Sequence, residues 1–133
     1  MLDHENDDRS YLFGRLLAIY ELIERAYNDS KKFNNKEEQR VTNAERYWTS
    51  YSNQPATMMK ILEDKIRYCI DYLQIKELGL WIKLDKERQE IVERLTPIMS
   101  DKSINQSLDY KFIFGYYAEK KFFYTKQIKE VEE

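Results

Sequence analysis

Residues that break helices are scarce in this chain, which contains three glycines and two prolines in 133 residues. A sheet protein of this size needs many tight turns, and tight turns are built largely from Gly, Pro and Asn. The scarcity therefore favours a few long helices. A chain of this length commonly forms one domain around one core. We predict an all-α fold, a single helical bundle of about five helices over residues 1–133.

Apolar residues recur at the three- and four-residue spacing of amphipathic helices in five segments. The expected helices span about residues 9–28, 36–50, 55–75, 80–99 and 107–130. Pro55 suits the first turn of the third helix, Gly79 marks the break before the fourth, and Ser107 is the expected N-cap of the fifth. The side chains of the last helix that we expect to face the core are Leu108, Ile113, Phe114, Tyr117 and Ala118.

Charge is unevenly distributed along the chain. The whole sequence carries 22 Lys and Arg against 24 Asp and Glu, a formal net charge of −2. Residues 1–8 contain four acids and residues 130–133 contain three, with no Lys or Arg in either segment, so we expect two mobile acidic ends. The remaining 22 bases and 17 acids give residues 9–129 a net charge of +5. Such a body can present a basic face to a nucleic acid.

The residues that catalysis and metal binding require are missing or isolated. The chain has one histidine, His4, and one cysteine, Cys69, whereas zinc sites use several such ligands at short spacing. We expect His4 to be an exposed surface residue, Cys69 to be buried, and the acids Asp85 and Glu87 to lie on a solvated face. No Gly-rich phosphate loop is present. The sequence predicts no enzyme, no metal, no cofactor and no small-molecule substrate.

Two further features bear on the compartment. The longest apolar run is only a few residues, far below the roughly 20 that a membrane-spanning helix needs. The single cysteine cannot form an internal disulfide, which suits a reducing cytosol. We therefore expect a cytoplasmic protein with no membrane partner.

Three segments are more specific than the composition. The first is a helix interrupted by Gly14, the second is a polar corner that leads into Pro55, and the third is an aromatic helix interrupted by Gly115. Glycine inside a helix costs roughly 0.5–1 kcal/mol relative to alanine, so another interaction should offset this cost. At Gly14 and Gly115 we favour close packing of two helices over contact with a ligand.

In this order and at this spacing, the three segments resemble the C-terminal region of the large subunit of type I-C CRISPR effector complexes. The resemblance spans about residues 10–124, nearly the whole chain. Trp48 stands where that family usually has phenylalanine. The residues that carry the resemblance are Leu12, Gly14-Arg15-Leu16, Arg46-Tyr47-Trp48, Ser50, Ser52, Pro55-Ala56-Thr57 and Gly115-Tyr116-Tyr117.

In that family, the same helical region is also made separately as a small subunit, from an internal start in the large-subunit gene. The resemblance implies that this chain, which opens with methionine just before the region, is the small subunit of a Cascade complex in a prokaryotic cytoplasm. It implies a non-catalytic protein that lies beside the guide RNA–target duplex and helps to hold the displaced DNA strand. The implied partners are other subunits of the effector complex, DNA and the guide RNA backbone.

A protein that holds a guide-selected strand needs cations for its phosphates, because base pairing already reads the sequence. Residues 110–129 contain five lysines and only one acid. Aromatic residues that could stack on bases are interleaved among the lysines. Basic residues of the second and third helices could extend this track. The candidate nucleic-acid-binding residues are Arg15, Arg40, Arg46, Lys60, Lys65, Arg67, Lys111, Lys120, Lys121 and Lys126.

Two alternatives stay open at this point. Arg15 and Arg46 could each pair with a buried carboxylate or bind a phosphate. Eleven tyrosines, two tryptophans and six phenylalanines exceed the needs of one small core and favour protein interfaces, including contacts with copies of the same chain. A protein–protein scaffold that does not touch nucleic acid is therefore the alternative function. If the chain instead binds a nucleic-acid strand, charge reversal at Lys120 and Lys121 should abolish that binding.

Overall fold

The computed structural model describes residues 2–31, 41–99 and 104–132, without the side chains of residues 99 and 126–132. These residues form helices and no strand, so the all-α prediction is confirmed. None of the described helices is both long and apolar enough to cross a membrane. The helices are α1 (Arg9–Ser30), α2 (Asn43–Arg46), α3 (Trp48–Asn53), α4 (Pro55–Lys65), α5 (Arg67–Lys76), α6 (Leu78–Met99) and α7 (Lys111–Glu132).

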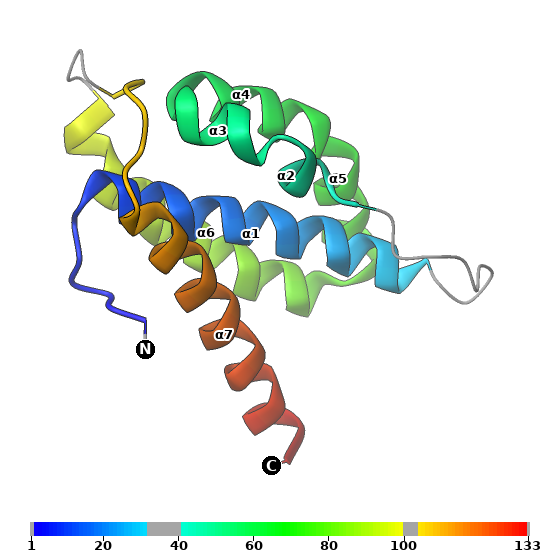
Figure 1. Cartoon of the computed structure of the whole chain (residues 1–133). Helices are drawn as coiled ribbons and strands as arrows, with labels where there is room; N and C mark the ends of the chain where they lie inside the picture. Colours follow the sequence, from blue (N-terminus) through cyan, green and yellow to red (C-terminus); the bar gives the residue numbers. More distant parts are fainter. Residues whose placement is uncertain (1, 32–40, 100–103, 133) are drawn as a thin grey trace.

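Helix α1 is the centre of the fold. It contacts α2, α4, α5, α6 and α7, and every residue from Ser10 to Glu24 is buried. Figure 1 shows α6 running alongside α1, the group α2–α5 covering another side, and α7 crossing obliquely. A helix that is covered on all sides belongs to the core of the protein rather than to its surface. The remaining helices are therefore arranged around α1 as a bundle.

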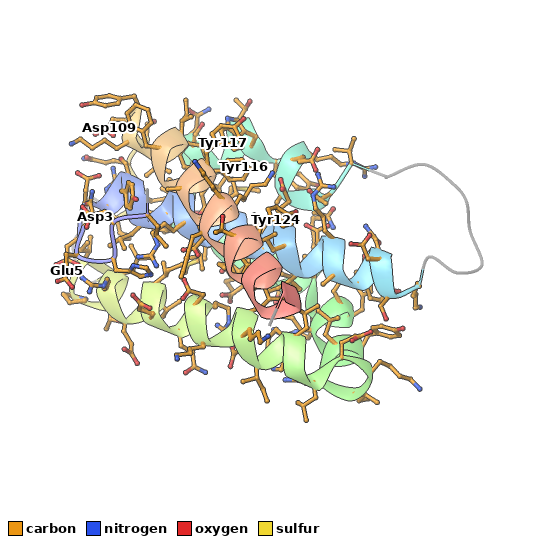
Figure 2. All side chains as sticks on the ribbon, turned by 90° about the horizontal axis from the view of Figure 1, so that it is seen from below. Asp3, Glu5, Asp109, Tyr116, Tyr117 and Tyr124 are labelled. Atoms are coloured by element: carbon orange, nitrogen blue, oxygen red, sulfur yellow. The ribbon has the colours of Figure 1, made fainter. Side chains whose placement is uncertain are left out.

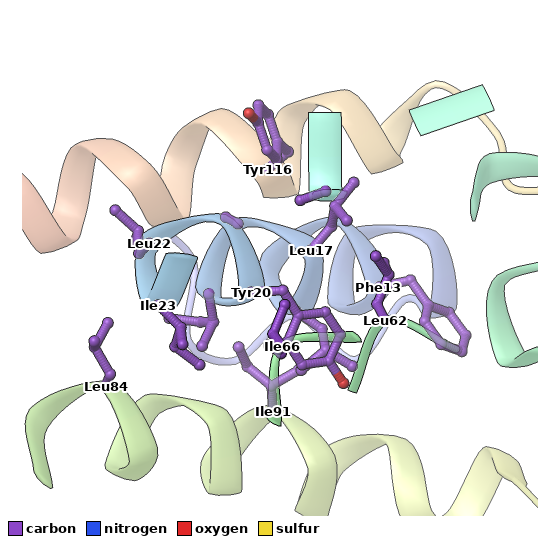
Figure 3. Close-up of a cluster of buried hydrophobic side chains, with 14 of the residues drawn as sticks. Phe13, Leu17, Tyr20, Leu22, Ile23, Leu62, Ile66, Leu84, Ile91 and Tyr116 are labelled. Carbon is purple, nitrogen blue, oxygen red and sulfur yellow. The ribbon is translucent and has the colours of Figure 1, made fainter. Parts of the chain in front are cut away.

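The apolar core lies between α1 and the helices that flank it. Figure 3 shows Tyr20 of α1 between Leu62 of α4 and Ile91 of α6, with Leu84 farther along α6. All four side chains are fully buried, and burial of an apolar side chain of this size stabilises the fold by roughly 1.5–3 kcal/mol. Cys69 of α5 joins the core at 1% exposure, as predicted, and burial raises the pKa of its thiol to about 11.

Two of the predicted helices are each divided in two. The predicted helix 36–50 corresponds to α2 and α3, which meet at Tyr47, and residues 36–40 lie outside the described residues. The predicted helix 55–75 corresponds to α4 and α5, which meet at Ile66. Ile66 is fully buried, so the bend keeps the apolar faces of both helices against α1. Neither glycine nor proline marks this bend, which is why the residue pattern does not reveal it.

The last two helices begin at positions other than those predicted. The break before α6 lies at Glu77, so Gly79 is inside the helix rather than ahead of it. Ser107 is not the N-cap of α7, which begins four residues later. The guanidinium of Arg9 donates hydrogen bonds to the carbonyl oxygens of Gln106 and Ser107, at 2.8 and 3.2 Å. These tertiary contacts hold the segment before α7 out of the helix.

The face of α7 that packs on α1 also differs from the prediction. Ile113, Phe114 and Tyr117 were expected to face the core and are instead 44%, 60% and 60% exposed. Both faces of this helix are aromatic, so hydrophobicity alone does not choose between them. The choice is made by Gly115, because its face allows the closest approach to α1. The buried residues of that face are Phe112, Gly115, Tyr116, Glu119 and Phe123.

Gly14 and Gly115 bring the backbones of α1 and α7 into contact. A Cβ atom at Gly14 would lie 2.1 Å from the carbonyl oxygen of Phe112, and one at Gly115 would lie 2.1 Å from the carbonyl oxygen of Tyr11. Real Cβ atoms do not approach a backbone oxygen so closely, and no flexible side chain is there to move aside. The predicted close packing at both glycines is confirmed.

Alanine substitutions at two glycines should therefore have opposite effects. Gly14→Ala must push α1 and α7 apart, and overpacking of this kind costs about 1–3 kcal/mol or more in free energy of unfolding. Gly79→Ala is the matched control, because a Cβ there meets nothing within 4 Å and alanine favours the helix by up to about 1 kcal/mol. Urea denaturation followed by circular dichroism compares the two. Equal midpoints would contradict the backbone contact.

Candidate nucleic-acid interface

The structure divides the predicted cations between two surfaces. Figure 1 shows α1 between α7 and the α4–α5 pair, so these two groups of helices lie on different sides of α1. Arg40 and the side chain of Lys126 lie outside the described residues. The described candidates on α7 are Lys111, Lys120 and Lys121, those on α4 and α5 are Lys60, Lys65 and Arg67, and Arg46 ends α2.

Arg15 is inside the protein and not on either surface. Its side chain is fully buried, and its Nε donates a hydrogen bond of 2.8 Å to the carboxylate of Glu119, which is also fully buried. Its Nη2 lies 3.6 Å from Glu87 and 3.9 Å from Glu90 of α6. Of the two roles left open for Arg15, the structure shows pairing with a buried carboxylate. Arg15 is therefore not available to a phosphate in this fold.

The carboxylates around Arg15 include one that keeps its proton near neutral pH. Burial, together with the adjacent Glu87, raises the pKa of Glu119 to about 8. Glu87 is itself 8% exposed, so its predicted position on a solvated face was wrong. One buried cation cannot neutralise several carboxylates equally well, and a shared proton lowers the cost of burying two of them together. The group is a structural ion-pair cluster that joins α1, α6 and α7.

Another buried acid, Glu21, pairs with Lys120. The ammonium of Lys120 lies 2.6 Å from the carboxylate of Glu21, which is fully buried on α1. Glu21 also accepts hydrogen bonds from Tyr116 and Arg25. Charge reversal at Lys120 would place two acids together in this site and disturb the fold. It is therefore not a specific test of nucleic-acid binding.

The other candidates differ in their surroundings. Lys111 lies 3.2 Å from Asp8, and Arg67 forms an ion pair with Asp64 at 3.4 Å. The ammonium of Lys65 lies over the ring of Tyr47, 5.3 Å from its centre. Among the described candidates, the exposed cations that make no ion pair with any described residue are Arg46, Lys60, Lys65 and Lys121.

Arg46 lies at the surface because hydrogen bonds to α1 hold the first turn of α2 in place. The carboxylate of Glu24, on α1, accepts hydrogen bonds from the backbone amides of Asn43 and Ala44, at 2.8 and 3.0 Å. These amides belong to the first turn of α2, where a negative charge is favourable. Thr42 caps the same turn by accepting a hydrogen bond from the amide of the residue three positions later. A helix of only four residues is thereby placed with Arg46 at its exposed end.

A groove of about 380 Å³ lies on the outer face of α7. Phe114 and Tyr117 line it and are each 60% exposed, and Lys121 follows on the same helix face. Figure 2 shows Tyr117 on α7, toward the end of the molecule where Asp109 lies. The groove combines two open aromatic rings with a cation that lacks an acidic partner among the described residues. The remaining lining residues are Tyr11 and Ala118.

His4, Glu87 and Glu90 form a group whose ligand atoms lie within 4.8 Å of one another. His4 is half-buried, with its ring edge on Phe122 at 5.0 Å between centres, so it is less exposed than predicted. The guanidinium of Arg15 already lies beside both carboxylates. A metal ion would have to share them with that positive charge. We therefore assign these carboxylates to the ion-pair cluster and no metal to the group.

Comparison with known protein families identifies the chain. The family model described as CRISPR-associated protein (Cas_Csd1) matches residues 1–124. The chain belongs to this CRISPR-associated family. Membership agrees with the resemblance in the ordered motifs around Gly14, Pro55 and Gly115, and it is consistent with a subunit of a Cascade-type complex. No curated protein matches the chain.

The residues that sequence reasoning missed in this family member are the buried acids. Glu87 lies three residues after Leu84 and four before Ile91, and both of these neighbours are fully buried. Glu119 lies four residues after Gly115, on the face that contacts α1. Helical spacing therefore contained a signal for both acids. It went unused because charged residues are rarely buried without a partner, and the partner, Arg15, is distant in sequence.

The buried proton predicts how stability depends on pH. The folded state holds a proton on Glu119 up to about pH 8, whereas the unfolded chain releases it near pH 4.5. Folding therefore takes up a proton in this range, and stability falls as pH rises from about 5 to about 8, on the order of 1 kcal/mol per pH unit at most. Glu119→Gln cannot release a proton, so it should lose less stability than the wild type over this range.

Urea denaturation at several pH values measures this difference. Glu93→Gln is the matched control, because Glu93 is exposed on α6 and should leave the wild-type pH dependence in place. Parallel profiles for Glu119→Gln and the wild type would show that Glu119 is ionised throughout.

Proposed function

We propose that this chain is the non-catalytic small subunit of a type I-C CRISPR interference complex. In this role it binds the nucleic-acid backbone without sequence preference and stabilises the guide RNA–target duplex and the displaced DNA strand. Its partners are the other subunits of the complex and further copies of itself, in the prokaryotic cytoplasm. Family membership and the order of the sequence motifs support this proposal.

The groove on α7 is the observation that carries the nucleic-acid part of the proposal. Stacking of a base on an exposed aromatic ring contributes about 1–3 kcal/mol and tolerates every base, because every base has a π-face. Phe114 and Tyr117 present such rings, and Lys121 offers a charge for a neighbouring phosphate. Neither contact reads a base edge. The groove therefore suits a strand whose sequence is selected elsewhere, by base pairing to a guide.

The cations on the other side of α1 form a second, weaker candidate surface. Lys60 on α4 is exposed and has no ion-pair partner among the described residues, and Lys65 of the same helix lies over the ring of Tyr47. Arg67 is already paired with Asp64. This surface can contribute long-range attraction for phosphates, while the α7 groove supplies the contacts that position a strand.

A protein–protein scaffold is the second candidate function. Ile75, Leu78 and Ile82 are 78%, 55% and 56% exposed at the corner between α5 and α6. Exposed apolar side chains gathered at one place are typical of surfaces that bind another protein. As a scaffold, the chain would form a stable complex with partner subunits and have no affinity of its own for DNA or RNA.

Fluorescence anisotropy of a labelled single-stranded DNA of mixed sequence separates these functions. We expect binding that weakens steeply between low and near-physiological salt. Phe114→Ala should lower the affinity by about 5- to 150-fold, the loss of one stacked base. Lys121→Glu should lower the affinity and reduce the dependence on salt.

Lys86→Glu is the matched control for the charge reversal, because Lys86 is exposed on α6 and carries the same charge. It should bind DNA far better than Lys121→Glu does. If both reversals weakened binding equally, the α7 groove would not be the site. An absence of binding by the wild type at low salt would leave the scaffold as the function.

A further inference from the structure

The acidic segment before α1 is held against the helices by specific contacts. The amide of Asp3 donates a hydrogen bond of 3.0 Å to the hydroxyl of Tyr11, and Asp8 accepts hydrogen bonds from the first amides of α1 as its N-cap. The ring of His4 packs edge-on against Phe122 of α7. In the structure the segment therefore lies against α1 and α7, while the predicted mobility of this end stays a prediction.

The acids of this segment form ion pairs with two basic side chains of other helices. Asp7 forms an ion pair of 2.7 Å with Arg94 of α6, and Glu5 lies 4.0 Å from the same guanidinium. Asp8 lies 3.2 Å from Lys111, at the start of α7. Without the segment, Arg94 would be a cation available to a phosphate, whereas Lys111 would still lie 3.9 Å from Asp109.

The same segment borders the groove on α7. Tyr11 lines the groove together with Lys121, and the hydroxyl of Tyr11 is the acceptor for the amide of Asp3. Figure 2 shows Asp3 and Glu5 side by side at the end of the molecule where Asp109 lies. The side chains of Glu5 and Asp7 are 91% and 68% exposed, so their charges face the solvent that a phosphate backbone would occupy.

We propose that the segment from Asp3 to Asp7 is an internal competitor of the phosphate backbone, which covers Arg94 until a bound strand displaces it. This inference rests on the proposed function, since it concerns the same groove. The carboxylates of Glu5 and Asp7 stand in for a phosphate on Arg94 and repel phosphates from the rim of the groove. Exposed ion pairs contribute little to stability, so a strand can displace them at low cost. The segment therefore weakens binding without abolishing it.

The double variant Glu5→Gln/Asp7→Asn tests this competition. It removes two exposed charges that face Arg94 and leaves Asp8, the N-cap of α1, in place. With the labelled single-stranded DNA, we expect about tenfold tighter binding at low salt. We also expect the plot of log K against log salt to steepen by about 0.7, the contribution of one additional phosphate contact to a single strand.

Asp29→Asn/Asp71→Asn is the matched control, because it removes two exposed acids that are distant in sequence from both the segment and Arg94 and changes the net charge equally. It should leave the slope at the wild-type value. Adding Arg94→Gln to the Glu5→Gln/Asp7→Asn variant should return the slope to that value, because the released cation is then missing.

The outcomes separate this inference from the proposed function. If the wild type binds DNA and the Glu5→Gln/Asp7→Asn variant behaves like its control, the acidic segment does not compete with the strand. The proposal that the α7 groove binds DNA is unaffected by that result. If the variant binds more tightly but Arg94→Gln does not reverse the change of slope, the role given to Arg94 is wrong. If none of these proteins binds DNA, the proposed function fails, and this inference fails with it.

Discussion

The backbones of α1 and α7 touch at Gly14 and Gly115, and much of the structure is arranged around this contact. Because each glycine lies against a carbonyl oxygen of the other helix, the two helices cannot rotate about their axes without a clash. The contact therefore fixes which residues of α7 are buried and which are exposed. It places Glu119 beside Arg15 on the inner side, and Phe114 and Tyr117 on the outer side.

Charges inside the bundle follow from the same geometry. From Ser10 to Glu24 helix α1 has no solvated face, so the charged residues of this part must find partners in the core. Arg15 finds Glu119 and Glu87, Glu21 finds Lys120, and Glu24 finds the first amides of α2. These pairs connect α1 to α2, α6 and α7. They also remove Arg15 and Lys120 from the cations that a nucleic acid could use.

The exposed face of α7 consists of the side chains that neither the core nor the buried ion pairs use. Its outer face keeps aromatic rings that the core does not need and one lysine without an acidic partner among the described residues. The family to which the chain belongs is CRISPR-associated. The acidic segment beside these side chains shows that the same end of the molecule carries both signs of charge. The net charge of the whole chain alone would not have revealed that acids and bases lie side by side there.

The sequence by itself determined the helical class, the single core, and the buried stripes of the central helices, because these depend on local spacing and on the scarcity of glycine and proline. It also determined the family, through short motifs in a fixed order. Only the tertiary structure decided the bend at Ile66, the exposed face of α7 and the division of the cations between two surfaces. Each of these depends on contacts between residues far apart in the chain. Local periodicity contains no record of which partner a charge or a glycine will meet.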